Sequence, residues 1–327
     1  MLSTRFTKMV GCSVPIQQAG LGAPANKKLA AAVANAGAQG MISWSHMPVG
    51  KLIENLDDLC VQTTGVFGVN FLVHHYENEA NEIHACVREA AARAKVIDFF
   101  YHDPIPALIE LVHQQEALVC WQVGSRAEAV AAVDAGCDFI IAQGIEAGGH
   151  VRGTIGLMAL LNEVLQVVEV PVLAAGGIGT GRNMAAALAA GADGVRVGTR
   201  FVATHESGAH PQYVEALIKA EARDTVYTDV FSYNWSDAPH RVLRSCVEAA
   251  QAYPEEIIGE QVSLRTGTRV PVHRFESFDI MMDTTGAIEA MPQFAGESVT
   301  GVTKQQSAAE VIQELSDEAE KFLKSWG

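Results

Sequence analysis

Three segments of the chain share one order of residues: an alanine-rich stretch, an Ala-Gly pair and a short apolar run. They span residues 31–43, 130–142 and 185–197. Glycine at the joint suits the left-handed residue that often ends a helix. The apolar run that follows is typical of a buried parallel strand. This recurrence predicts repeated βα units.

The same pattern predicts eight strands with helices between them. The expected strands are 14–18, 40–43, 67–72, 96–101, 117–122, 139–143, 172–175 and 194–197. The expected helices are 26–36, 49–62, 77–94, 104–115, 126–135, 156–168 and 181–190. Eight alternating units favour an α/β fold of the (β/α)₈ TIM-barrel type, and a doubly wound open sheet is the alternative.

The βα rhythm stops near residue 220, which suggests a division of the chain. We expect residues 1–220 to form the barrel and residues 221–290 to form an irregular, partly helical insertion on the substrate side, with a helix near 241–253. Residues 291–327 are expected to pack back on the barrel, because 307–324 has the pattern of an amphipathic helix.

Composition excludes several classes of protein. Apolar residues make up 49% and charged residues 19%, which is typical of a globular chain. The formal net charge of −15 argues against nucleic acid or an anionic membrane as a partner. Six scattered cysteines form no CxxC pair, and no segment resembles a signal peptide or a membrane span. We therefore expect a cytoplasmic protein with reduced thiols.

Two glycine-rich turns follow the last two predicted strands. Gly176 and Gly177 follow the seventh, and Gly198 and Thr199 follow the eighth. Backbone N–H groups in such turns approach an anion without obstruction by Cβ atoms, and the helix that follows adds a partial positive charge. Together the turns predict a phosphate site at the carboxyl ends of the strands, where function collects in this architecture.

The sixth strand runs into a loop that ends with Gly148, Gly149 and His150. The ordinary pKa of imidazole, about 6.5, suits removal of a proton from a carbon acid or support of an anion. We expect His150 to act in the site and Glu146 to be a loop carboxylate. His74 and His75 are expected to be solvated, and nothing nearby completes a metal site.

Amides at strand ends add further candidates. Asn70 and Gln122 end the third and fifth strands and can pair with the edge of a heteroaromatic ring. Residues 20–25 match the GxGxxA pattern of a dinucleotide fold. The strand that follows ends without the acidic residue which that fold requires, so we discount it.

With these residues assembled, the chain resembles the nitronate monooxygenase family, also known as 2-nitropropane dioxygenases. The matching stretches lie in family order over nearly the whole chain. They read VPIQQAGLG, AAAVANAGAQG, FGVNF, IIAQGIEAGGHVRG, PVLAAGGIGTGRNMAAALAAGADGVRVGTRF, TDVFSYNWSDAPHRVLRS and FAGESV. The combination of AQGxEAGGH, AAGGI and VGTRF is more specific than any single glycine motif.

The resemblance implies a TIM barrel that binds FMN without a covalent bond. It places the phosphate on the two glycine turns, the first loop along the flavin ring, and polar and glycine residues around the rest. The implied FMN-binding residues are Ala19, Gly20, Leu21, Gly22, Asn70, Gln122, Gln143, Gly148, Gly149, Gly176, Gly177, Gly198 and Thr199. His150 matches the catalytic histidine of the family. The implied reaction oxidises nitronates, and nitroalkanes after removal of a proton, with O₂ to a carbonyl compound and nitrite.

Two departures and several alternatives accompany this resemblance. Leu21 stands where the family often has Met, and Glu297 stands where it often has Gln, which leaves the contact of residue 297 open. The rival functions are an FMN-dependent NAD(P)H enoyl-acyl-carrier-protein reductase, an NAD(P)H:quinone reductase and a non-catalytic barrel for a phosphorylated ligand. The aromatic residues of 227–235 suit either a lid or a homodimer contact.

Overall fold

The main sheet is a barrel of eight parallel strands. The computed structural model describes residues 2–325, and its strand order is β1-β9-β8-β6-β5-β4-β3-β2. These strands are β1 (Ile16–Gln18), β2 (Gly40–Ser43), β3 (Phe67–Leu72), β4 (Val96–Phe100), β5 (Leu118–Val123), β6 (Phe139–Gln143), β8 (Val172–Ala175) and β9 (Gly194–Val197). A parallel bridge between Gln17 and Gln39 joins the two edge strands. The predicted TIM barrel is confirmed.

Helices surround the barrel in the predicted order. They are α2 (Lys27–Asn35), α3 (Val49–Gln62), α4 (Tyr76–Ala91), α5 (Pro106–His113), α6 (Arg126–Asp134), α7 (Leu157–Leu165) and α8 (Gly181–Ala189). Their apolar faces pack on the strands in the largest hydrophobic cluster of the protein. The helix that comes directly after β9, however, is the four-residue α9 (Thr199–Val202), which is too short to cover the barrel wall.

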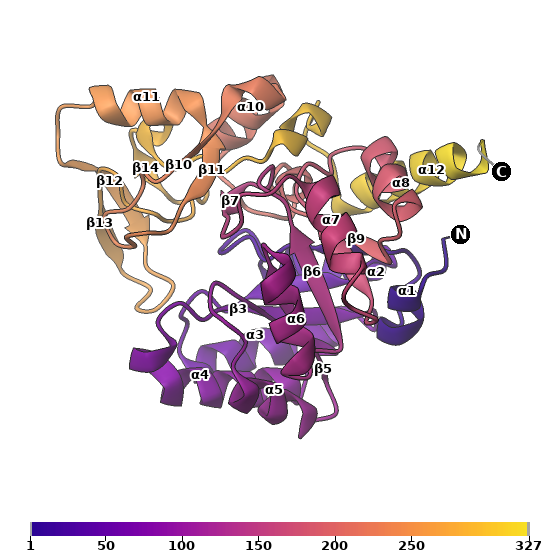
Figure 1. Cartoon of the computed structure of the whole chain (residues 1–327). Helices are drawn as coiled ribbons and strands as arrows, with labels where there is room; N and C mark the ends of the chain where they lie inside the picture. Colours follow the sequence, from indigo (N-terminus) through magenta and orange to yellow (C-terminus); the bar gives the residue numbers. More distant parts are fainter. Residues whose placement is uncertain (1, 326–327) are drawn as a thin grey trace.

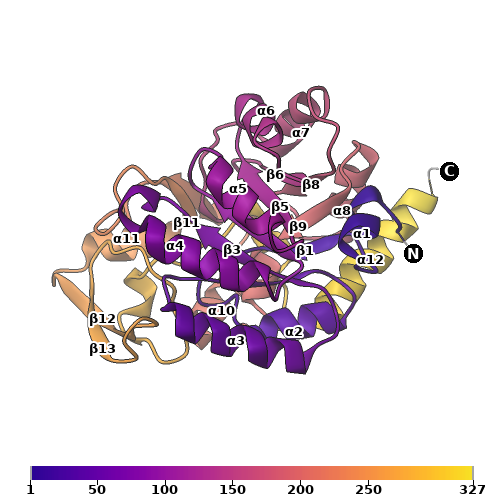
Figure 2. The same ribbon diagram turned by 90° about the horizontal axis from the view of Figure 1, so that it is seen from below.

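The C-terminal helix takes the place of the missing eighth helix. The long α12 (Ala308–Lys324) packs against α8 and α2, so the ring of helices closes through a segment far along the chain. Figure 2 shows α12 beside α2 at the edge of the barrel. Its buried residues, among them Val311, Ile312 and Leu315, join the main core.

A short helix covers the amino-terminal end of the barrel. Helix α1 (Arg5–Val10) inserts Phe6 and Val10 into a cluster with residues of β6 and β8. The ring of Phe6 meets that of Phe139 edge-on, with centroids 5.5 Å apart. Arg5 fixes the helix through two short hydrogen bonds to the Asp193 carboxylate. The barrel is therefore open only at the carboxyl ends of its strands.

The chain after β9 builds a cover over that open end. Its elements are α10 (Pro211–Lys219), η1 (Ala222–Asp224), β10 (Thr225–Thr228), β11 (His240–Leu243), α11 (Arg244–Ala252), β12 (Ile257–Val262), β13 (Arg269–His273), β14 (Thr285–Gly286), η2 (Ile288–Ala290) and η3 (Glu297–Gly301). Figure 1 shows most of them grouped beside the barrel. They have a second hydrophobic cluster of their own.

Two small antiparallel sheets shape this cover. One has the order β10-β11-β7, in which β7 (Gly149–His150) comes from the loop after β6. The other has the order β13-β12-β14. The helix expected near 241–253 begins only at Arg244, because residues 241–243 extend β11 and pair with β10 and β7. The pairing of β11 with β7 depends on the loop after β6. The local sequence pattern of residues 241–243 does not reveal this long-range contact.

The predicted division at residue 220 falls at the C-cap of α10. The ends of the predicted outer segments, residues 1 and 326–327, lie outside the described residues. Among residues 2–325, no helix is both long and apolar enough to cross a membrane.

We predict that Phe6→Ala lowers the free energy of unfolding by about 3–5 kcal/mol, because the Phe6 side chain is fully buried and its loss leaves a cavity at the closed end of the barrel. Denaturant unfolding followed by circular dichroism measures the change. Val61→Ala is the matched control, since Val61 is 89% exposed. Equal effects of the two substitutions would contradict the role of α1.

Candidate active site

A cavity of about 930 Å³ lies at the carboxyl ends of the barrel strands, beneath the cover. Its volume is in the range usual for small-molecule sites. Every residue singled out from the sequence as a cofactor contact lines this cavity, and so does His150. These cofactor candidates are Ala19, Gly20, Leu21, Gly22, Asn70, Gln122, Gln143, Gly148, Gly149, Gly176, Gly177, Gly198 and Thr199.

The turn after β8 presents free backbone donors to the cavity. Gly176 and Gly177 have φ angles of +101° and +69°, which favour glycine. A Cβ on Gly176 would lie 3.0 Å from the Gly144 carbonyl oxygen. Within the described chain, the N–H groups of Gly176, Gly177 and Gly198 donate no hydrogen bond to the protein. These donors therefore suit an anion from outside the chain.

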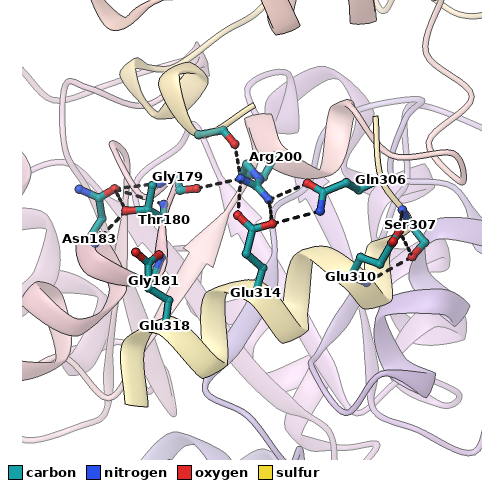
Figure 3. Close-up of polar contacts among 11 residues, drawn as sticks. Gly179, Thr180, Gly181, Asn183, Arg200, Gln306, Ser307, Glu310, Glu314 and Glu318 are labelled. Carbon is teal, nitrogen blue, oxygen red and sulfur yellow. Dashed lines mark hydrogen bonds and ion pairs between the residues drawn. The ribbon is translucent and has the colours of Figure 1, made fainter. Parts of the chain in front are cut away.

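The start of α8, by contrast, is satisfied by the protein itself. The Gly181 N–H donates to a Glu318 carboxylate oxygen at 2.7 Å (Figure 3). The Thr180 and Asn183 side chains form a capping box. Since α12 supplies Glu318, the C-terminal helix occupies the anion-binding end of α8. The donors that remain for an anion are therefore the backbone N–H groups of the turn after β8, and not the start of α8.

A second anchor connects α12 to the residue that follows Thr199. The Arg200 guanidinium donates to Glu314 at 3.1 Å and to the Gln306 amide oxygen at 3.0 Å (Figure 3). It also donates to the carbonyls of Gly179 and Gly301. Arg200 is buried and does not line the cavity. The network fixes both glycine turns against α12.

The first loop is held from two sides. A Cβ on Gly20 would lie 2.2 Å from the Asn70 amide oxygen, so the loop passes directly over that side chain. Further along, the Ala23 N–H donates to the Asp279 carboxylate at 2.7 Å. Burial raises the pKa of Asp279 to about 6. Asp279 belongs to the cover, so this contact joins the cover to the barrel mouth.

His150 stands in β7, where pairing with His240 of β11 sets its position. Its ring packs against Trp235 with centroids 4.0 Å apart, and the rings of Tyr101 and Phe294 lie within 6 Å. Aromatic side chains thus enclose the imidazole on several sides. Within residues 2–325, the one hydrogen bond of the imidazole ring joins Nε2 to the Ser277 hydroxyl at 3.5 Å, which is long.

This enclosure changes the acidity of the imidazole. Burial, together with the nearby His240 and His74, lowers the pKa of His150 to about 3. The expectation of an ordinary imidazole pKa is therefore wrong, and His150 is neutral at pH 7. A neutral imidazole can donate one hydrogen bond and accept another, but it is a weak base.

His74 lines the cavity and is half-buried, so it is less solvated than expected. His74 stacks on Trp235 with ring centroids 3.8 Å apart, and burial lowers its pKa to about 3. His75 is exposed at the cavity rim. Trp235 lies between His74 and His150. The sequence marked residues 227–235 as rich in aromatic residues but gave no indication that Trp235 contacts these two histidines. Within residues 2–325, no group of metal-ligating side chains could hold an ion.

Two acidic side chains of the loops have structural partners. Glu146 accepts the Leu157 N–H with both carboxylate oxygens at 2.9 Å, which supports its interpretation as a loop carboxylate at the start of α7. At residue 297, the backbone N–H donates to the Glu146 carbonyl, and the carboxylate lies 3.4 Å from Nη1 of Arg241. A carboxylate at 297 is thus matched by a cation of the cover.

The sequence reasoning missed one pair of residues in the cavity floor. Arg196 in β9 lines the cavity and forms an ion pair at 2.5 Å with Asp98 of β4. Each stands as the single charged residue in a short buried strand, and that signal could have identified them. Nearby, the Gln143 amide nitrogen donates to the His150 carbonyl at 3.1 Å, and its oxygen has no partner among the described residues.

Comparison with protein families gives one match over nearly the whole chain. The model of the family described as nitronate monooxygenase matches residues 3–318. A probable nitronate monooxygenase of Staphylococcus haemolyticus is 29% identical over 272 residues, which cover 70% of this chain and 76% of the relative. A carboxyl-CoA dehydrogenase of Rhodococcus jostii is 34% identical over 244 residues, or 75% of this chain and 66% of the relative.

Two solved structures are similar over the full length. FabK from Thermotoga maritima superimposes with a TM-score of 0.81 at 29% identity, covering 100% of this chain and 99% of its own. A nitroalkane oxidase from Streptomyces ansochromogenes has a TM-score of 0.80 at 27% identity, covering 98% and 99%. The barrel and its cover are therefore shared with both proteins.

We predict that Gly176→Ala lowers the free energy of unfolding by about 1–3 kcal/mol, because a Cβ is strained at this φ angle and crowds the Gly144 carbonyl. Thermal unfolding measures the change. The control is Gly50→Ala in α3, where a Cβ meets nothing within 4 Å and helix propensity predicts a gain of about 0.5–1 kcal/mol. A neutral Gly176→Ala variant would show that the turn tolerates other geometries.

Proposed function

The chain belongs to the nitronate monooxygenase family and is an oxidoreductase, and on that premise we propose that it uses bound FMN and O₂ to oxidise nitronates to carbonyl compounds and nitrite. The observation that carries this proposal is one cavity in which unpaired backbone donors, unpaired polar side-chain atoms and an enclosed neutral histidine meet. Each of these features lies at the open end of the barrel.

The residues present fit FMN at three points. The free N–H groups of Gly176, Gly177 and Gly198, with Thr199 beside them, would hold its phosphate. The loop Ala19 to Gly22 has no room for a side chain at Gly20, which suits close approach of a flat ring. The third point is a set of polar groups in the cavity walls. Asn70, Gln122, Gln143, Gly148 and Gly149 would surround the rest of the cofactor.

FMN would supply the electron acceptor and the centre that reacts with O₂. The chain itself would bind the nitronate over the ring, where His150 donates a hydrogen bond that orients its oxygens. The rings of Trp235, Tyr101 and Phe294 surround His150 and limit its contact with water. In this less polar surrounding, the hydrogen bond from the neutral imidazole is stronger than it would be in solvent.

The low pKa of His150 favours nitronates over neutral nitroalkanes as substrates. A nitronate has already lost its α-proton, so it needs only a hydrogen-bond donor. A neutral nitroalkane must lose that proton to a base, and an imidazole with a pKa of about 3 is a poor one. We therefore propose that the preformed nitronate is the main substrate, and that His150 is the base for any nitroalkane turnover.

A reductase that uses NAD(P)H is the second candidate, because the similarity to FabK is as extensive as the similarity to the nitroalkane oxidase. The net charge of −15 is unfavourable for an acidic carrier protein as a partner. A non-catalytic barrel is excluded by membership of an enzyme family.

Anaerobic spectroscopy of the purified protein separates these functions. We expect a yellow protein whose flavin is reduced rapidly by a preformed nitronate and slowly, if at all, by NADH. Admission of O₂ should restore the yellow colour and release one nitrite for each carbonyl product. Rapid reduction by NADH without reduction by the nitronate would instead establish the reductase.

We predict that His150 contributes no limb to the pH profile for the preformed nitronate between about pH 5 and 8, and that any limb near pH 6 comes from Asp279, which also lines the cavity and has a raised pKa of about 6. The lowered pKa of His150 means that the imidazole gains a proton only as the pH falls toward 3, so it stays neutral throughout this window. Stopped-flow values of kcat/KM measure the profile. A limb near pH 6.5 that disappears in His150→Asn would overturn the assignment of a neutral imidazole.

The same variant separates the two roles of His150. His150→Asn keeps an N–H donor but has no basic nitrogen, so we expect turnover of a neutral nitroalkane to fall by about a hundredfold or more. Turnover of the preformed nitronate should fall less, and the flavin should stay bound. Undiminished turnover of the nitroalkane would remove His150 from proton transfer.

A further inference from the structure

The cavity floor contains a buried cation whose hydrogen-bonding capacity is only partly used. The side chain of Arg196 is 4% exposed, and Nη2 donates to Asp98 Oδ2 at 2.5 Å. Within residues 2–325, neither Nε nor Nη1 of Arg196 has a hydrogen-bond partner. Buried N–H donors of a charged group are costly to leave unpaired. An acceptor from outside the chain is therefore expected at this place.

Asp98 does not accept a hydrogen bond from Nε or Nη1 of Arg196 in this structure, and its oxygens have other partners. Oδ2 also accepts a hydrogen bond from the Asn70 amide at 2.6 Å, and Oδ1 accepts one from the Cys120 thiol at 3.6 Å. Asp98 is fully buried, so no water reaches it in the folded protein. It holds one end of the guanidinium and leaves the other end free.

Arg196, whose Nε and Nη1 are buried and unpaired among the described residues, lines the cavity together with Gln143, whose amide oxygen is also buried and unpaired. Arg196 and Gln143 lie at the same level of the barrel, since both are in register with Ala175 of β8. The floor thus offers unpaired donors and an unpaired acceptor to one ligand. The pyrimidine edge of a flavin, with carbonyl oxygens and N1 as acceptors and one N–H as donor, has the matching chemistry.

We propose that Arg196 binds the N1–C2 carbonyl edge of the flavin and stabilises the negative charge that this edge gains on reduction. This inference rests on the proposed binding of FMN and adds the residue that sets the electron affinity of the cofactor. Asp98 is a positioning residue that fixes the guanidinium and offsets part of its charge. A cation beside this edge raises the reduction potential, and its counter-ion lowers it.

Sulfite is a suitable probe because it needs neither nitronate nor turnover. It adds to an oxidised flavin through its sulfur lone pair, and the ring takes up the negative charge, which bleaches the yellow colour. The dissociation constant of this adduct therefore reports the charge around the pyrimidine edge. The two-electron reduction potential, measured by equilibration with a reference dye, gives a second readout.

For Arg196→Gln, we expect sulfite to bind at least tenfold more weakly than to the wild-type flavoprotein. A tenfold change in a two-electron equilibrium corresponds to about 30 mV, so the potential should fall by that amount or more. Arg196→Lys keeps the charge and should recover most of the affinity for sulfite. Asp98→Asn removes the counter-charge and should shift both quantities in the opposite direction.

Arg200→Gln is the matched control. Arg200 is a second buried arginine only four residues along the chain, but its partners are on α12 and it does not line the cavity. Any flavin that this variant retains should bind sulfite as the wild type does. An equal effect at both arginines would reduce Arg196 to a merely structural role.

The outcomes separate this inference from the proposed function. A wild-type protein without flavin would overturn both. A flavin-loaded Arg196→Gln variant with unchanged sulfite affinity and potential would overturn the inference alone. A higher KM for nitronate with those two quantities unchanged would assign Arg196 to the substrate, which also overturns it. If Arg196→Gln does not fold, Asp98→Asn decides: tighter sulfite binding supports the inference, and unchanged binding overturns it.

Discussion

Burial of the site residues under the cover is the constraint on which the chemistry of this protein depends. The cover contributes Trp235, and the loop after β6 contributes His150, which the cover holds in a small sheet. Burial then lowers the pKa of His150 and raises that of Asp279. Without the cover, His150 would be exposed to solvent and its hydrogen bonds would compete with water.

The C-terminal helix makes the phosphate turns available for a ligand. By supplying Glu318 to the start of α8 and Glu314 to Arg200, α12 satisfies the groups around the turns. The N–H groups of the turns themselves stay unpaired. One helix therefore completes the barrel wall, anchors both turns and leaves their donors for an anion. Because α12 covers this part of the barrel wall, α9 can be a single short turn after β9.

The sequence was sufficient to predict the barrel and the residues that line the carboxyl ends of its strands. Parallel strands end at one edge, so glycines and amides placed directly after predicted strands had to meet, and they line one cavity. The pairing of β7 with β11 was not accessible, because it joins residues about 90 apart whose local patterns give no register. For the same reason, the acidity of His150 could not be inferred. Its pKa depends on His240, His74 and burial under Trp235, none of which is near it in the chain.

Arg196 and His150 together suggest why the site combines a charged floor with a neutral wall. In the proposed reaction, negative charge moves from the nitronate to the cofactor. A cation at the floor favours that movement, since it lies on the receiving side. A charged imidazolium beside the nitronate would oppose it, because it would hold the negative charge on the donor. A neutral His150 orients the substrate through a hydrogen bond without this penalty. The burial that makes His150 a poor base would then also make it a suitable partner for a substrate that must give up charge.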